Sequence, residues 1–197
     1  QELAKIFSKT AVEVCEGQQY DVDFEQQAQV STEQYLKMIA YKTAVLVGAA
    51  LKMGAIIAQT TEENKQKIYD FGLTLGIAYQ LQDDYLDTFG DDTFGKKIGG
   101  DILQNKKTLL YLKALEKGTP TQKQELHALY TTEPKSEAEK IARVTELFVT
   151  TQSHTYLREQ VEAYTLKAFA ILDTLDIPKE KKEILKEFGS SLMNRTI

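Results

Sequence analysis

The residues best suited to chemistry lie together in segment 79–87, which reads Tyr-Gln-Leu-Gln-Asp-Asp-Tyr-Leu-Asp. On a helix, Asp83 and Asp87 are one turn apart and face the same way, and Gln80 lies on the same stripe. Asp84 is offset from Asp83 by about 100°. These carboxylates repel one another, and a hard divalent cation such as Mg²⁺ would relieve the repulsion by taking oxygen ligands. The alternative is a solvated acidic face, because runs of charge usually lie on the surface.

Lysines that could neutralise a phosphate group lie outside this segment. They are Lys42 in an otherwise apolar stretch, Lys96 and Lys97 in a glycine-rich segment, and Lys106 shortly after it. A lysine ammonium is a point charge suited to phosphate oxygens. The alternatives are an ordinary solvated lysine at position 106 and, at position 42, an ammonium that reaches water from a helix edge. Glycine-rich segment 89–105 fits either a flap over a charged ligand or a solvated loop between helices. Together these features predict a site for a metal ion and a diphosphate.

Composition narrows the class of protein. The chain has 197 residues, 42% of them hydrophobic, and a net charge of −5. This acidic balance does not predict a broad basic face, so we expect no nucleic-acid partner. The single cysteine, Cys15, excludes an intrachain disulfide and fits a reducing compartment such as the cytoplasm. The longest apolar stretch, residues 44–58, is shorter than the roughly 20 residues of a membrane span. We therefore expect a buried core helix there and no transmembrane segment.

The apolar residues recur at three- and four-residue steps nearly everywhere, which predicts an all-α protein. Helix starts are indicated by a Ser or Thr followed three residues later by Glu or Gln, at Ser31, Thr60 and Ser136, and by Thr119 before Pro120. We expect helices over residues 35–57, 64–88 and 136–175, and a last helix after Pro178 that ends near Met193. We expect interruptions over residues 17–30, 89–105 and 131–135.

Five segments occur in the order found in trans-type polyprenyl diphosphate synthases, the group of farnesyl and geranylgeranyl diphosphate synthases. Segment 80–87 resembles the family's second aspartate-rich motif, and Lys42-Thr43 resembles its Lys-Thr pair. Segment 16–21, Glu-Gly-Gln-Gln-Tyr-Asp, resembles its Gly-Gln-x-x-Asp sequence. Segment 95–102, Gly-Lys-Lys-Ile-Gly-Gly-Asp-Ile, resembles its flap, and Asn105-Lys106 resembles the lysine that follows.

The resemblance implies an all-α, antiparallel helical bundle of the isoprenoid synthase type. It also implies a prenyltransferase that condenses isopentenyl diphosphate with an allylic prenyl diphosphate through Mg²⁺-assisted ionisation. The metal ligands it implies are Asp83, Asp84 and Asp87. The catalytic residues it implies are Lys42, Thr43 and Gln80. The substrate-binding residues it implies are Gln18, Asp21, Lys42, Lys96 and Lys106, with Lys97 as the alternative to Lys96.

The sequence departs from the family at its first aspartate-rich motif and the paired arginines that follow, which are not present. In the family they lie N-terminal to the segments matched here. We therefore expect residues 1–197 to be the C-terminal portion of one synthase domain, inactive alone, with the N-terminal helices missing. The alternatives are a non-catalytic regulatory subunit of a heteromeric prenyl synthase, a terpene cyclase of related fold, and an acidic helical protein that binds cations or another protein. The family further implies a homodimer. Product chain length is not determined by these residues.

Overall fold

The computed structural model describes residues 1–91 and 97–193, which form helices and connecting turns without any strand. The helices are α1 (Glu2–Gln26), α2 (Thr32–Ile39), the π-helix η1 (Ala40–Ala44), α3 (Val45–Ile57), α4 (Glu62–Phe89), α5 (Gly100–Leu103), α6 (Leu109–Lys117), α7 (Pro120–Thr131), α8 (Glu137–Thr150), α9 (Ser153–Asp173) and α10 (Lys179–Met193). The chain divides into two compact units. The first unit contains residues 1–22, 36–80 and the described part of 161–195, and the second contains residues 23–35 and the described part of 81–160. The all-α expectation is confirmed.

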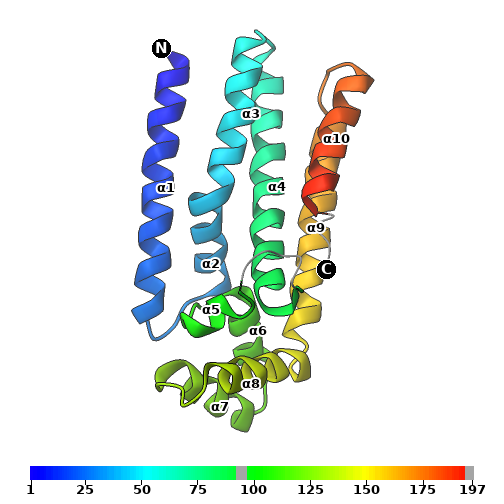
Figure 1. The fold of residues 1–197 in the computed structure, drawn as a ribbon. Helices are drawn as coiled ribbons and strands as arrows, with labels where there is room; N and C mark the ends of the chain where they lie inside the picture. Colours follow the sequence, from blue (N-terminus) through cyan, green and yellow to red (C-terminus); the bar gives the residue numbers. More distant parts are fainter. Residues whose placement is uncertain (92–96, 194–197) are drawn as a thin grey trace. The chain divides into compact units, whose positions relative to one another are not determined.

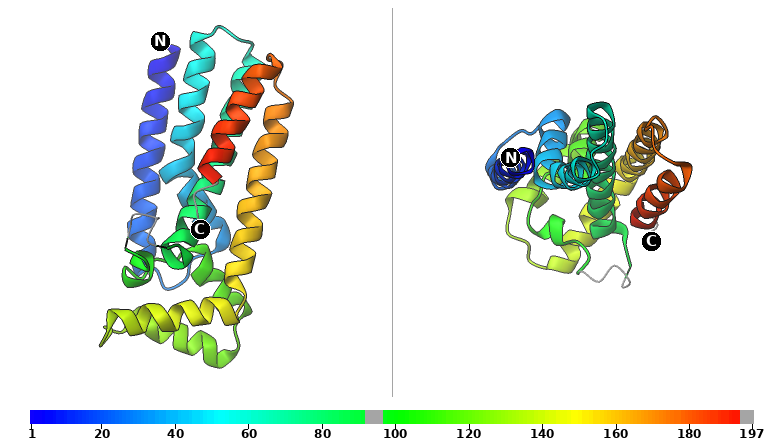
Figure 2. Two further views of the ribbon diagram at one scale, coloured as in Figure 1. Left: turned by 45° about the vertical axis from the view of Figure 1, so that its right-hand side comes forward. Right: turned by 90° about the horizontal axis from the view of Figure 1, so that it is seen from above.

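In the first unit, long helices run side by side in the order α1, α3, α4, and then α9 with α10 (Figure 1, Figure 2). Small residues let η1 and α3 approach α4 closely. A Cβ added to Gly76 would lie 2.7 Å from Ala44 Cα, and one added to Gly72 would lie 2.9 Å from Gly48 Cα. On the other side of α4, an apolar core consists of Phe71, Leu75, Ala168, Leu172 and Leu175. Burial on both sides of α4 makes it the central helix of this unit.

In the second unit, α6, α7 and α8 pack against one another, and α5 packs against α8. Their buried core includes Leu110, Leu126, Val144, Leu147 and Phe148. The predicted helix starts at Thr119 and Ser136 are both confirmed. Thr119 and Gln122 form a reciprocal capping box, and Ser136 Oγ accepts a hydrogen bond from the Glu139 N–H.

The interruption expected over residues 17–30 is wrong for most of that segment, because α1 continues to Gln26. Gly17 suggested a loop, but it serves a close approach between helices instead. It is buried, and a Cβ at this position would lie 2.2 Å from the backbone nitrogen of Lys42. No side chain fits between these backbones, so glycine is needed inside a regular helix.

The single helix expected over residues 136–175 is also wrong, because the chain turns between α8 and α9. Gln152 adopts a left-handed conformation with φ of 57°. The hydroxyl of Thr151 donates to Leu147 O at 2.7 Å, and that of Ser153 donates to Phe148 O at 3.1 Å, which satisfies carbonyls at the end of α8. Neither glycine nor proline marks this turn in the sequence, so the hydrophobic pattern runs through it.

Two further helix starts can be compared with the prediction. The capping box at Ser31 is confirmed, because Ser31 and Gln34 exchange hydrogen bonds between their backbone N–H groups and side-chain oxygens. The start predicted at Thr60 is displaced by one residue. The Asn64 N–H donates to Thr61 Oγ1 at 3.2 Å, and α4 begins at Glu62.

The continuous helical stretch Thr32–Ile57, formed by α2, η1 and α3, is long and apolar enough to cross a membrane by those two criteria. The core helix of a soluble protein meets the same criteria. Within the first unit, Ala44, Val45, Gly48 and Ala49 of this stretch are buried. Ala44 and Gly48 make the close approach to α4, so this part of the stretch belongs to the packed interior of the unit. The expectation of a buried core helix over residues 44–58 is wrong for the rest of that segment, where Leu46 is 54% and Ile57 is 71% exposed.

Candidate functional site

Lys42 and Thr43 lie on η1, the π-helical turn of five residues between α2 and α3. A π-helical turn widens a helix by one residue, and such turns occur frequently at functional sites. The close contact with Gly17 falls on the backbone of this widened turn. Contact with α1 therefore constrains the backbone of η1. The conformation of that backbone determines the direction in which the side chains of Lys42 and Thr43 leave the helix.

Lys42 forms an ion pair with Asp21 of α1, with 2.5 Å between Nζ and Oδ2. The two side chains are 30% and 13% exposed, so the pair is only partly screened by water. A charge-assisted hydrogen bond of this kind holds the ammonium in one orientation. Gln18, one turn before Asp21 on α1, is exposed. Of the predicted substrate-binding residues in this unit, the structure joins Lys42 and Asp21 directly.

Thr43 and Gln80 form the second polar contact of the first unit. The Thr43 hydroxyl donates to Gln80 Oε1 at 2.8 Å, which links η1 to α4. The hydroxyl proton is engaged in this bond, while the lone pairs of the Thr43 oxygen still provide a dipole for a positive charge. The family resemblance implies a catalytic role for both residues, and the structure brings them together across 37 positions of sequence.

Asp84 lies in the second unit and is 5% exposed. Its carboxylate accepts a hydrogen bond from the hydroxyl of Tyr35, a residue that is 1% exposed. Burial raises the pKa of the Tyr35 hydroxyl well above its usual range, and the negative charge of Asp84 raises it further. The hydroxyl therefore keeps its proton and donates a hydrogen bond to Asp84. One oxygen of the predicted metal ligand Asp84 is thus engaged within the protein.

Asp87 ties the end of α4 to the start of α5. Its Oδ2 accepts a hydrogen bond from the Asp101 N–H at 2.9 Å, and a Cβ on Gly100 would come within 3.0 Å of its Oδ1. Lys106 Nζ lies 2.9 Å from Asp101 Oδ1. Burial raises the pKa of Asp87 to about 6, with a further contribution from the negative charge of Asp101. Asp87, Asp101 and Lys106 therefore form one electrostatic group.

The remaining predicted ligands are Asp83, which is half-buried, and Lys96, which lies outside the described residues. Lys97, the alternative to Lys96, forms an exposed ion pair with Glu137 of α8 at 2.7 Å. Among residues 1–91 and 97–193, no three His, Cys, Asp or Glu side chains are close enough together to hold a metal ion by themselves. A cation at Asp83 and Asp87 would need further oxygen ligands, as Mg²⁺ commonly takes from phosphate groups and water.

Sequence reasoning missed Tyr35 as the partner of Asp84. Tyr35 lies 49 positions away from Asp84, at the start of a helix, and no sequence pattern there indicates this contact. Sequence reasoning also missed the close helix contact at Gly17. A glycine needed for a turn and a glycine needed for close packing cannot be told apart in a single sequence. Asp101 was recognisable because it belongs to the flap-like segment.

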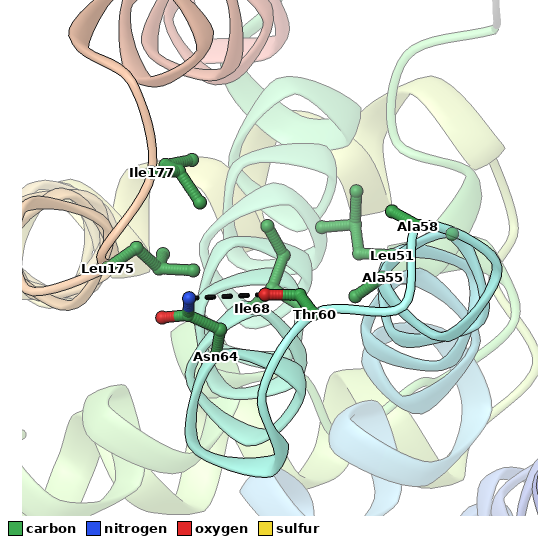
Figure 3. Close-up of a pocket in the computed structure, with 9 residues that line it drawn as sticks. Leu51, Ala55, Ala58, Thr60, Asn64, Ile68, Leu175 and Ile177 are labelled. Atoms are coloured by element: carbon green, nitrogen blue, oxygen red, sulfur yellow. Dashed lines mark hydrogen bonds between the residues drawn. The ribbon is translucent and has the colours of Figure 1, made fainter.

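A pocket of about 260 Å³ lies elsewhere in the first unit, where α3, α4 and the turn after α9 meet (Figure 3). Leu51, Ile68, Leu175 and Ile177 contribute most of its apolar lining. The side-chain amide of Asn64 donates hydrogen bonds to Thr60 Oγ1 at 3.2 Å and to Asp176 O at 3.0 Å. Its N–H groups are therefore engaged by neighbouring turns rather than directed to a ligand in the pocket. None of the predicted site residues that the structure describes lines this pocket.

The fold is that of the isoprenoid synthases. A crystal structure of a geranylgeranyl pyrophosphate synthase matches all of this chain and 61% of its own chain, with a TM-score of 0.93 and 46% identity. A second, the geranylgeranyl pyrophosphate synthase from Corynebacterium glutamicum in complex with isoprenyl diphosphate and magnesium, matches 98% of this chain and 55% of its own, with a TM-score of 0.89 and 30% identity.

The chain belongs to the polyprenyl synthetase family, whose model matches residues 1–148. Among the curated relatives, the geranylfarnesyl diphosphate synthase of Natronomonas pharaonis is 36% identical over 188 residues. That match covers 95% of this chain and 53% of the relative, so the chain spans about half the length of that protein. The resemblance drawn from the five sequence segments is thereby confirmed.

Proposed function

We propose that the protein containing this chain is a prenyltransferase that lengthens an allylic prenyl diphosphate by condensing it with isopentenyl diphosphate. The observation that carries the proposal is the pairing of Lys42 with Asp21 and of Thr43 with Gln80 in a member of this family. Relatives that match most of the chain are named as geranylfarnesyl and geranylgeranyl diphosphate synthases. We further propose that the whole chain forms part of one synthase domain.

In this proposal the residues of the first unit act on the allylic substrate. Lys42 binds the diphosphate and stabilises the negative charge that grows as the carbon–oxygen bond breaks. The Asp21 carboxylate and the exposed amide of Gln18 border the same site. The oxygens of Thr43 and Gln80 supply dipoles beside the carbon that becomes positive. A water-poor surrounding protects such a cation from being quenched.

The carboxylates of α4 fit Mg²⁺ by their chemistry, because Asp83 and Asp87 are one turn apart on a helix and neither is fully buried. Asp83 and Asp87 would hold the ion with diphosphate oxygens, and Asp84 would orient this turn of the helix through Tyr35. When bound, Mg²⁺ neutralises the leaving diphosphate. As the family motif implies, Lys96 and Lys106 are proposed to bind a substrate diphosphate.

The test is a turnover assay on the intact gene product, with isopentenyl diphosphate, geranyl or farnesyl diphosphate, and Mg²⁺, and with products identified by mass spectrometry. We expect products longer by whole isoprene units and a loss of turnover in Asp83→Ala. Asp70→Ala is the matched control, because Asp70 lies on the same helix and bonds to Gln66 at 2.9 Å. Absence of elongation in the wild-type protein would refute the proposed activity, and it would favour a non-catalytic subunit.

We also propose that the protein acts as a homodimer in the cytoplasm. The homodimer is supported by the family resemblance, and we propose that apolar side chains of α1, among them Phe7 at 64% and Val12 at 57% exposure, lie in the dimer interface. Sedimentation of the intact gene product should give twice the subunit mass. Phe7→Glu should shift it toward the monomer, and Lys9→Glu, a neighbouring charge change, should leave it a dimer.

A further inference from the structure

Lys140 of α8 is a buried cation that the family motifs do not include. It is 3% exposed, and its ammonium donates to the side-chain oxygen of Asn105 at 2.6 Å. The ring of Tyr130 lies 5.6 Å from the same ammonium. The two direct partners of this charge are therefore a neutral amide and an aromatic ring. Burial lowers the pKa of Lys140, and the negative charge of Glu133 opposes that effect only in part.

Asn105 is the residue immediately before Lys106, and it adopts a left-handed conformation with φ of 56°. Asparagine tolerates this conformation better than most residues, but it does not require it. The Lys106 N–H then donates to Asp101 O at 2.9 Å, which closes the turn after α5. The conformation of Asn105 thus determines how Lys106 leaves the backbone.

A neighbouring residue of α8 supports the other end of the same segment. Gly99 has a φ of 81°, and a Cβ at this position would lie 2.7 Å from the side chain of Ile141. Residues 140 and 141 of α8 therefore contact the segment 99–106 at both of its left-handed positions. Between those two positions lie Asp101 and its hydrogen bond to Asp87.

We propose that Lys140 is a positioning residue, which holds Asn105 so that Lys106 is directed to the diphosphate of the substrate. The inference rests on the proposed function, since it assigns Lys106 to that ligand. The physical reason is the cost of burying an ammonium group, which one amide oxygen and the charge of Glu133 together do not offset. An apolar side chain of similar length would stabilise the fold at least as well, so the charge is explained by the group that it orients.

The experiment compares variants of the intact gene product for binding of inorganic diphosphate with Mg²⁺, by isothermal titration calorimetry. We expect Lys106→Met and Lys140→Met each to raise the dissociation constant about tenfold. We expect the double variant to match Lys106→Met, because two residues that act through one contact are not additive. Lys140→Arg should restore most of the affinity. Lys113→Met is the matched control, since Lys113 is another buried lysine of this unit and is paired with Glu116.

Three outcomes would overturn the inference: unchanged affinity in Lys140→Met, an additive loss in the double variant, or an equal loss in Lys113→Met. If Lys140→Met does not fold, Asn105→Gly breaks the same hydrogen bond from the other side while permitting the left-handed conformation. It should give the same loss of affinity, and unchanged affinity there would also refute the role. A wild-type protein that binds no diphosphate would instead refute the proposed function, and the inference with it.

Discussion

Replacing Tyr35 with phenylalanine tests the contact that holds Asp84. The substitution removes one hydroxyl and keeps the ring, so it creates almost no cavity. Tyr35 is 1% exposed and Asp84 is 5% exposed, and water therefore cannot easily take the place of the hydroxyl. A hydrogen bond to a charged group contributes about 1.5–3 kcal/mol. We expect Tyr35→Phe to lower the free energy of unfolding by about 2–3 kcal/mol, near the upper end of that range, because the contact is buried.

The free energy of unfolding can be measured by denaturant titration at pH 7 for the wild type, Tyr35→Phe, Asp84→Asn and the double variant. The double-mutant cycle separates the energy of this contact from other effects of each substitution. We expect a coupling energy of more than about 1 kcal/mol. Tyr156→Phe is the control, because it removes a hydroxyl from another tyrosine of the same unit and keeps the ring that faces Lys113.

The control should change the free energy of unfolding by less than about 0.5 kcal/mol, as is usual for a substitution away from such contacts. A loss of that small size in Tyr35→Phe would refute the reasoning, as would a coupling energy near zero. Either result would mean that the carboxylate of Asp84 is stabilised by other groups. The predicted orienting role of Tyr35 toward the acidic turn of α4 would then be withdrawn.

Three further predictions concern single residues. Lys42→Ala should weaken binding of an allylic diphosphate by about 1.5–3 kcal/mol, measured by calorimetry; full affinity would limit Lys42 to its ion pair with Asp21. Gly17→Ala should destabilise the fold by about 1–3 kcal/mol in denaturant titration, because the added Cβ would lie 2.2 Å from Lys42 N, and an unchanged midpoint would contradict that close approach. Burial raises the pKa of Asp87 to about 6 from 3.8, so without Mg²⁺ its contribution to stability is present at low pH and is lost as pH rises through about 6. Asp87→Asn should not show that loss, and parallel pH profiles for the two proteins would count against the raised pKa.

Most helices could be predicted from local pattern, because three- and four-residue spacing and capping residues act within one or two turns. The start of α7 at Thr119-Pro120 and that of α8 at Ser136 were predicted correctly for this reason. The turn at Gln152 was not predicted. Hydroxyl groups stabilise its left-handed backbone, and neither a glycine nor a proline indicates the turn in the sequence.

The sequence by itself determined the helical class, the order of the polar segments and the residue types available to bind a metal ion and a diphosphate. Only the tertiary structure decided which of those residues meet. It joined Lys42 to Asp21 and Thr43 to Gln80, and it assigned one oxygen of Asp84 to a tyrosine that no motif contains. The physical reason is distance along the chain. Helix formation depends on residues a few positions apart, whereas these contacts depend on how the helices pack. Packing depends in turn on the shapes of the helix surfaces, such as the absence of a side chain at Gly17.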